Sequence, residues 1–131
     1  MEINQTKALT ITGYVLTGIF VLFMAFDVVI KLIRLPIVGE TMVQMGWPPE
    51  LGFTIGLLEL IAVALYIWPR TAVLGAVLMT AILGGAVATH VRIASPLFSH
   101  VLFGVYLGLF MWGGLWLRTP ALRALLPCKP S

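Results

Sequence analysis

Residues 51–68 read LGFTIGLLELIAVALYIW, an apolar run of membrane-spanning length that contains one charged residue, Glu59. Three further runs resemble it: residues 8–26 and 72–88 hold no charged residue, and residues 97–117 hold only the ionisable His100. An α-helix needs about 20 mostly apolar residues to cross a hydrocarbon core that is roughly 30 Å thick. The sequence therefore predicts an all-α integral membrane protein, an antiparallel four-helix transmembrane bundle.

The composition agrees with a membrane location. Of the 131 residues, 60% are hydrophobic and 10% are charged, and the mean hydropathy is +1.06. Soluble globular domains carry about 25% charged residues. The segments outside the apolar runs are too short to bury a core of their own. We therefore expect residues 1–131 to form a single membrane domain with spans at residues 8–33, 51–68, 71–92 and 97–118, whose first partner is the lipid bilayer.

The net charge of +3 comes from basic residues that stand singly at the ends of the runs. A nucleic-acid partner needs a basic patch or stripe, so no such partner is predicted. The face that holds both termini carries five basic residues, and the opposite face carries two or three. The five are Lys7, Arg70, Arg118, Arg123 and Lys129, and the others are Arg34, Arg92 and Lys31. Positive charge favours the cytoplasmic side, so we expect cytoplasmic termini.

Five ionisable residues interrupt the apolar pattern, and such residues are costly in lipid and commonly functional. They are Asp27, Lys31, Glu59, His90 and His100. At ~1.5 Å of rise per residue, all five lie in the half of the membrane next to the first loop, with Glu59 roughly 12 Å deep. We predict that they surround one polar half-cavity inside the bundle.

Small residues predict which helix faces touch, because they let two backbones approach closely. Glu59 shares one such face, three residues after Gly56, and His100 shares another, four residues before Gly104. We expect three stripes of small residues to make helix contacts. They are Gly52 and Gly56, Gly104 and Gly108, and Ala81, Gly85 and Thr89.

Six residues are candidates for a ligand-binding site: Asp27, Lys31, Glu59, His90, Arg92 and His100. Glu59 stands out, because a carboxylate this deep needs a partner; Lys31 or Arg34 can supply the charge, and His90 a hydrogen bond. The structural alternatives are an intrahelical Asp27–Lys31 pair at a helix end, a salt bridge of Glu59 that locks the bundle, and histidines that are ordinary near an interface. No further Cys or Asp stands at ligand spacing, so no metal site is predicted.

Several motifs resemble the DoxX-like family of small bacterial membrane proteins. They are Gly56-Leu57-Leu58-Glu59-Leu60, Trp68-Pro69-Arg70, the run from Gly84 to Arg92 followed by Pro96-Leu97-Phe98, and Trp112-Gly113-Gly114-Leu115-Trp116. The resemblance covers all four spans and implies a four-helix bundle in the bacterial cytoplasmic (inner) membrane. It marks Glu59, Lys31 and His90 as site positions. Relatives often carry glycine in the segment 26–30, where this chain has Asp27, so Asp27 is a departure that balances Lys31.

The resemblance implies a subunit or partner of a thiosulfate:quinone oxidoreductase, or a membrane anchor in oxidative-stress or quinone-related detoxification complexes. The leading hypothesis is a binding subunit whose polar half-cavity holds the head group of a quinone, a lipid or another amphipathic small molecule. Its tail would lie against Phe20, Phe23, Met24 and Phe26. No cofactor is predicted apart from a bound quinone. The expected protein partners are a soluble or membrane oxidoreductase and a second copy of the chain.

Two other functions stay open. An intramembrane enzyme would use Glu59 and His90 as catalytic acid and base on an apolar substrate. A small proton-coupled transporter would use the carboxylates as a proton relay. Transport is less favoured, since the polar cluster is displaced toward one face and no broken helix or inverted repeat marks a midplane site.

Overall fold

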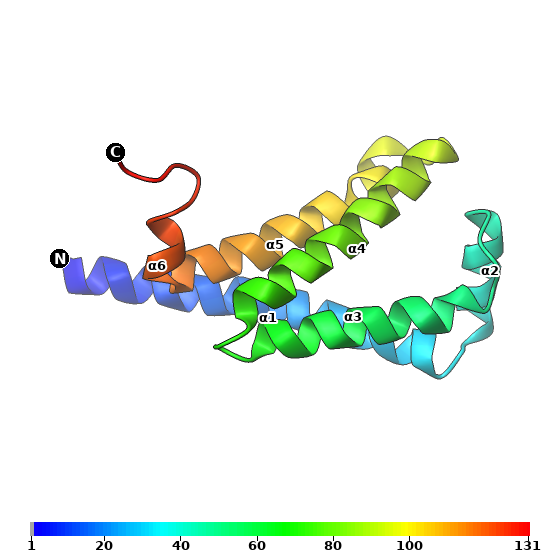
Figure 1. Ribbon diagram of the computed structural model, residues 1–131, viewed down its shortest axis with the longest axis horizontal. Helices are drawn as coiled ribbons and strands as arrows, with labels where there is room; N and C mark the ends of the chain where they lie inside the picture. Colours follow the sequence, from blue (N-terminus) through cyan, green and yellow to red (C-terminus); the bar gives the residue numbers. More distant parts are fainter. Residues whose placement is uncertain (1) are drawn as a thin grey trace.

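The computed structural model describes residues 2–131, and it is a bundle of helices (Figure 1). The four long helices are α1 (Glu2–Leu32), α3 (Leu51–Ile67), α4 (Ala72–Arg92) and α5 (Phe103–Arg118). The shorter ones are α2 (Pro36–Gln44), the π-helical turn η1 (Leu97–Val101) and α6 (Pro120–Arg123). The part of the chain that the structure describes contains no strand. The predicted fold class, an all-α membrane bundle, is confirmed.

The long helices run alternately in opposite directions, so both termini lie at the same end of the bundle (Figure 1). Helix α1 packs against α3 and α5, and α4 packs against the same two helices. Six large side chains are fully buried between them: Tyr66, Phe20, Met24, Met79, Met111 and Leu115. Many large apolar side chains, among them Leu22, Phe26 and Leu109, are exposed on the outside. So much exposed apolar surface fits a protein surrounded by lipid.

Three helical segments of the described chain are long and apolar enough to cross a membrane: Ile3–Leu32, Ala72–Arg92 and Leu97–Arg118. Helix α3 is apolar but shorter, with 17 residues. It spans about 26 Å at ~1.5 Å per residue, which is the lower end of the length that crosses a bilayer. The spans expected from the sequence coincide with these helices to within a few residues, except that α1 begins earlier, at Glu2.

The segment between the first two spans differs from the expected loop, because residues 36–44 form helix α2. Pro36 stands at the first helical turn, where the fixed φ of proline favours helix initiation. Val38 and Met42 are buried, and both approach Gly52 at the start of α3. The i, i+4 spacing of these two apolar residues is typical of a helix that packs on one face.

The fourth expected span is not one continuous α-helix. After Pro96 the chain forms the π-helical turn η1, in which the Val101 N–H donates to the Pro96 carbonyl at 3.1 Å and the Leu102 N–H donates to the Leu97 carbonyl at 2.9 Å. Helix α5 then continues from Phe103. π-Helical turns are rare and frequently occur at functional sites.

Two of the expected glycine contacts are confirmed. A Cβ built on Gly56 would lie 2.8 Å from the Cβ of Lys31, and one built on Gly104 would lie 3.1 Å from the Leu83 carbonyl oxygen. A Cβ at Gly56 would be closer than real Cβ contacts come, and one at Gly104 would be tighter than most of them, so neither position accepts a large side chain without a shift of the neighbouring helix. Helix α3 therefore approaches α1 at Gly56, and α5 approaches α4 at Gly104.

The expected contact at Gly85 on α4 was wrong, since a Cβ there would meet nothing within 4 Å, whereas Thr89 of the same stripe is buried. The sequence did not predict two of the tightest approaches. Gly75 of α4 lies against the backbone of Tyr66 in α3, and a Cβ on Gly13 of α1 would lie 2.8 Å from the Gly114 carbonyl oxygen in α5. Both approaches lie toward the end of the bundle that holds the termini, so the helices are packed most closely there.

Replacing the contact glycines should loosen the bundle. Gly56→Leu and Gly104→Leu each force a side chain into backbone or Cβ atoms of a neighbouring helix, so we expect each to lower stability by about 1–3 kcal/mol or more. Gly18→Leu is the matched control, because a Cβ there meets nothing within 4 Å. Thermal unfolding in detergent measures the effect. Equal melting temperatures for all three variants and the parent would contradict the assigned helix contacts.

Candidate functional site

The candidate site begins with three charged side chains at the end of α1 and in the middle of α3. Lys31 lies between two carboxylates: its Nζ donates to Oε1 of Glu59 at 2.7 Å and to a carboxylate oxygen of Asp27. The Lys31 and Glu59 side chains are 14% and 7% exposed, and that of Asp27 is 25% exposed. The expected pairing of Glu59 with a basic residue of the first span is thus present, and it includes the intrahelical Asp27–Lys31 pair.

The local sequence explains why these three groups meet. Asp27 and Lys31 stand four residues apart in the same helix and share one face. Glu59 follows Gly56 by three residues and shares its face of α3. Because Gly56 has no side chain, α1 approaches α3 at Lys31 itself. The close approach of the two helices therefore lets the ammonium group reach Glu59 directly.

One oxygen of this cluster has no hydrogen-bond partner. The Glu59 residue is 5% exposed, and its Oε2 is buried without a partner among the described residues. Buried polar atoms are nearly always hydrogen-bonded, so such an exception needs an explanation. The sequence offered His90 as a hydrogen-bond donor to Glu59, but Nδ1 of His90 lies instead 2.9 Å from Oγ of Ser95.

The two histidines form a separate pair on the other side of the site. The His90 and His100 rings lie edge to face, with centroids 5.7 Å apart. Nδ1 of His100 lies 2.7 Å from Oγ of Ser99, so each ring is held by a serine hydroxyl near the turn between α4 and η1. His100 lies in the π-helical turn η1, and its ring contacts that of His90 in α4.

The carboxylates, Lys31 and both histidines line one cavity of about 490 Å³. All four long helices contribute to its wall, together with α2 and the residues that follow it. The apolar part of the wall includes Phe23, Met24, Ile82, Leu83, Phe103 and Leu107. Apolar residues of α2 and the segment after it, among them Ile37, Met42 and Trp47, also line the cavity. The charged and imidazole groups therefore form one polar cluster in an otherwise largely apolar wall.

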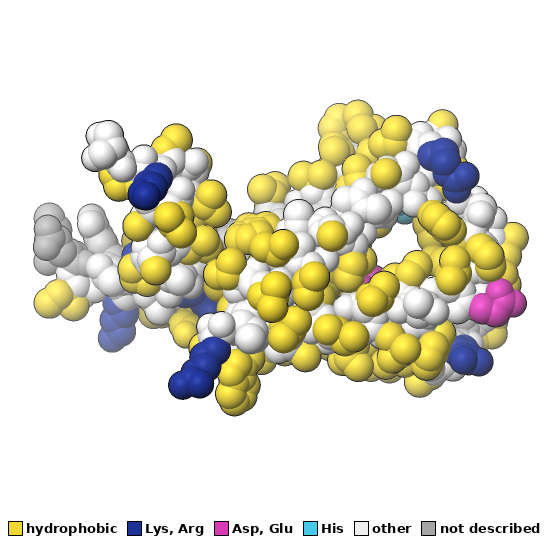
Figure 2. All heavy atoms as spheres, in the orientation of Figure 1, with side chains coloured by type: hydrophobic (Ala, Val, Ile, Leu, Met, Phe, Trp, Pro, Cys, Tyr) yellow, Lys and Arg dark blue, Asp and Glu magenta, His cyan; other side chains and the backbone are white. Residues whose placement is uncertain are grey.

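The cavity is open on the side of the bundle. Figure 2 shows an opening between α3 and α4, which meet at their connecting turn and diverge toward α2 (Figure 1), and acidic and histidine atoms are visible at its inner edge. On the α4 side the wall contains small residues, among them Ala81, Gly85 and Ala86. Since the opening lies between two membrane-spanning helices, it faces the lipid.

The two arginines near the site have other contacts. The Arg92 guanidinium donates to the Met45 carbonyl and lies 5.9 Å from the centre of the Trp47 ring. Arg92, proposed from the sequence as a ligand-binding residue, is not among the residues that line the cavity. It fastens the segment after α2 to the end of α4. Gly46 in that segment has a φ of 82°, a conformation that favours glycine.

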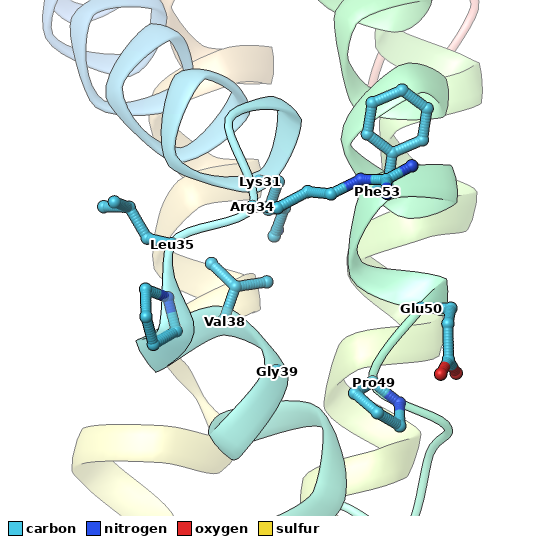
Figure 3. Close-up of a pocket in the computed structure, with 9 residues that line it drawn as sticks. Lys31, Arg34, Leu35, Val38, Gly39, Pro49, Glu50 and Phe53 are labelled. Atoms are coloured by element: carbon cyan, nitrogen blue, oxygen red, sulfur yellow. The ribbon is translucent and has the colours of Figure 1, made fainter.

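Arg34 belongs to a second, smaller hollow of about 300 Å³ between α1, α2 and α3. Its side chain extends from the end of α1 to Phe53 (Figure 3), and the guanidinium lies 4.6 Å from the centre of that ring. Lys31 and Val38 line both hollows. Lys31 rather than Arg34 is therefore the cation that neutralises Glu59.

The sequence missed part of the cavity wall. Ile37, Val38, Thr41 and Met42 of α2 all line the cavity, although the expected spans place their segment in the first loop. Of the four residues expected at the ligand tail, Phe23 and Met24 line the cavity. Phe20 is fully buried against Tyr66, with ring centroids 5.3 Å apart, and Phe26 is 65% exposed. Among the residues described, no group of three His, Cys, Asp or Glu side chains is arranged to hold a metal ion.

A comparison with protein families places this geometry in a known group. The model of the DoxX-like family matches residues 15–114. The chain belongs to the DoxX-like family. The matched region of this DoxX-like protein contains all five ionisable residues that line the cavity. No curated protein and no solved structure matched the chain.

The DoxX-like bundle should depend on the Lys31–Glu59 pair. Glu59→Ala removes one of the two charged hydrogen bonds of the buried ammonium and leaves it paired with Asp27, so we expect a loss of about 1.5–3 kcal/mol in the free energy of unfolding. Glu59→Gln keeps an oxygen that can accept from Lys31 and should destabilise much less. The triple variant Asp27→Asn/Lys31→Met/Glu59→Ala should recover most of the loss, because it leaves none of the three charges without a partner. Unfolding in detergent or nanodiscs measures all three, and parent-like stability of Glu59→Ala would contradict the pairing.

Proposed function

We propose that this DoxX-like protein is a membrane-embedded binding subunit whose cavity holds an amphipathic small molecule. The single observation that supports it best is the cavity itself. Its volume of about 490 Å³ lies within the roughly 300–1,000 Å³ of small-molecule sites. Its wall combines one cluster of charged and imidazole groups with a larger set of apolar side chains, which suits a polar head group joined to an apolar tail. Quinones, membrane lipids and other amphiphiles have this form.

The opening between α3 and α4 gives such a ligand a direct path from the lipid. A molecule dissolved in the bilayer would enter between α3 and α4, where the α4 side of the wall contains the small residues Ala81, Gly85 and Ala86. A ligand that is soluble in water would have to pass α2 and the Trp47 segment, which Arg92 holds against the end of α4. The lateral path therefore favours a lipophilic ligand.

Filling the cavity wall at Gly85 should block binding without damaging the fold. A Cβ on Gly85 meets nothing within 4 Å, and Gly85 lines the cavity, so the side chain of Gly85→Leu would extend into the ligand's space. Gly84→Leu is the matched control, since Gly84 is equally free of neighbours and is not among the lining residues. Native mass spectrometry and lipid extraction should find a copurifying amphiphile in the parent and in Gly84→Leu, and at least several-fold less in Gly85→Leu.

Two outcomes would argue against the proposal. A parent protein that copurifies with no amphiphile, and takes up none when ubiquinone or extracted lipids are added to nanodiscs, has an empty cavity. Equal occupancy in Gly84→Leu and Gly85→Leu places the bound molecule elsewhere. Thermal stability, measured on the same samples, confirms that both variants are folded.

The resemblance to DoxX-like proteins adds a cellular setting to the proposal. In that setting the chain lies in the bacterial inner membrane and serves as a subunit or partner of an oxidoreductase. A quinone bound in its cavity would then be available to that oxidoreductase. A second copy of the chain is the other partner proposed. Copurification of the tagged protein from its native membrane, followed by identification of stably associated chains, tests this setting.

An acid–base enzyme is the second candidate. It is favoured by one observation, that Glu59 and His90 line the same cavity without bonding to each other. A substrate between them could exchange protons with a carboxyl at one side and an imidazole at the other. Glu59→Gln and His90→Gln would then both abolish turnover of the bound molecule, whereas a pure binding subunit returns it unchanged.

The orientation of the bundle follows from its charges. Five basic residues near the termini and fewer at the α2 end favour cytoplasmic termini. Cys128, which is exposed, should therefore react with a membrane-impermeant maleimide only from the cytoplasmic side. In a Cys128→Ser background, Thr41→Cys should react only from the opposite side. Labelling of both cysteines from one side would refute the four-span topology, and exchanged sides would invert it.

A further inference from the structure

We propose that the cavity selects an amphiphile whose head group is a primary ammonium, with Glu59 as the residue that recognises it. This inference rests on the binding function proposed above and names the ligand class of the same site. Two features of the described residues support this inference. The charged side chains in the cavity have an excess of negative charge, and one buried carboxylate oxygen has no hydrogen-bond partner.

The charges of the polar cluster in the cavity do not cancel. Asp27 and Glu59 contribute two carboxylates, and among residues 2–131 Lys31 is the one ammonium that pairs with them. The next basic side chains are occupied elsewhere: Arg34 lies over Phe53, and Arg92 donates to the Met45 carbonyl. With both carboxylates ionised and the histidines neutral, the cluster carries one negative charge. An uncompensated charge in a lipid-surrounded cavity is unfavourable unless a proton or a cation neutralises it, and a cationic ligand supplies that positive charge.

The hydrogen bonding points to the same ligand. A carboxylate can only accept hydrogen bonds, and Lys31 already occupies Oε1 of Glu59. The free Oε2 therefore needs a donor that no described side chain supplies. The two imidazoles on the same cavity are held by Ser95 and Ser99 through Nδ1, and neither makes a hydrogen bond to Glu59.

Candidate head groups can be ranked on these two requirements. A primary ammonium donates to Oε2 and neutralises the charge, and a hydroxyl donates but leaves the charge. A quinone carbonyl does neither, because it only accepts. A carboxylate or phosphate adds further negative charge. The apolar tail of each would lie along Phe23, Met24 and Leu107, so the tail does not distinguish between them.

Competition between amphiphiles of equal tail length tests this ranking. The full chain is placed in phosphatidylcholine nanodiscs, which contain no primary amine, and dodecylamine is offered together with dodecanol or dodecanoate at equal mole fractions. Native mass spectrometry counts the bound molecules. We expect at least tenfold more amine than alcohol on the parent and on Gly84→Leu, and no carboxylate. In Glu59→Gln the amine-to-alcohol ratio should fall to near one, because the charge and the acceptor-only oxygen are both lost.

The outcomes separate this inference from the function on which it rests. If amine and alcohol bind equally to the parent and both are lost in Gly85→Leu, the cavity binds amphiphiles and the ammonium preference is refuted. A preference for the carboxylate also refutes it, since Lys31 would then dominate recognition. If none of the three binds, the binding function itself fails. A Glu59→Gln variant that keeps the amine preference shows that another group recognises the ammonium.

The source of the ammonium is resolved by the nanodisc composition. A lipid with an ethanolamine head group and a single-chain amine share the chemistry that Glu59 recognises. Phosphatidylethanolamine is added to the parent and to Gly85→Leu, in which any remaining dodecylamine is bound nonspecifically. If it displaces dodecylamine from the parent only, the membrane's own lipid is a ligand. If dodecylamine stays bound in its presence, the cavity takes single-chain amines. Either result upholds the ammonium preference.

Discussion

The ion pair between Lys31 and Glu59 is the interaction on which the arrangement of the bundle depends. Neither group is stable alone among lipid-facing helices, because an unpaired charge in a low-dielectric interior is costly. Their 2.7 Å contact requires the end of α1 to lie directly against α3, and Gly56 makes that approach possible. Asp27 adds a second acceptor from the same helix as Lys31. One electrostatic requirement thereby fixes the distance between α1 and α3 at the end that carries α2.

The two ends of the bundle differ in how closely their helices pack. Toward the termini, Gly75 and Gly13 bring helix backbones together, and Tyr66 is fully buried with its hydroxyl donating to the Met111 carbonyl at 2.7 Å. Toward α2, α3 and α4 diverge and leave the cavity (Figure 1). The rigid end can hold the helices in place while the open end exchanges a ligand. Close packing and an open site are therefore both possible in a chain of only 131 residues.

Sequence patterns predicted the parts of the structure that depend on hydropathy and helical spacing. The four spans, the Lys31–Glu59 pair and the shared location of both histidines follow from apolar run length, depth and the i, i+3 and i, i+4 rules. The sequence did not predict which glycines face a neighbouring helix. Gly85 and Gly75 both lie in apolar stretches of α4, yet a Cβ at Gly85 would meet open space and one at Gly75 would meet the Tyr66 backbone. The rotation of each helix about its axis decides which residues face a neighbour, and the local sequence pattern does not determine that rotation. The wall formed by α2 was missed because its nine residues include Pro36 and Gly39 and are followed by Gly46 and Pro48-Pro49, a composition that resembles a loop.

The polar cluster and the cavity are best understood as one feature. Apolar side chains packed against Glu59 would leave Oε2 buried without a partner permanently, at a cost comparable to a lost hydrogen bond to a charged group. A cavity at the same place lets a ligand or water supply the missing donor. Occupancy then stabilises the folded bundle, since any molecule that binds only the folded state shifts the folding equilibrium toward it. Glu59 thus has two roles: its Oε1 joins α3 to Lys31 of α1, and its unpartnered Oε2 is the atom that gains a hydrogen bond from a ligand.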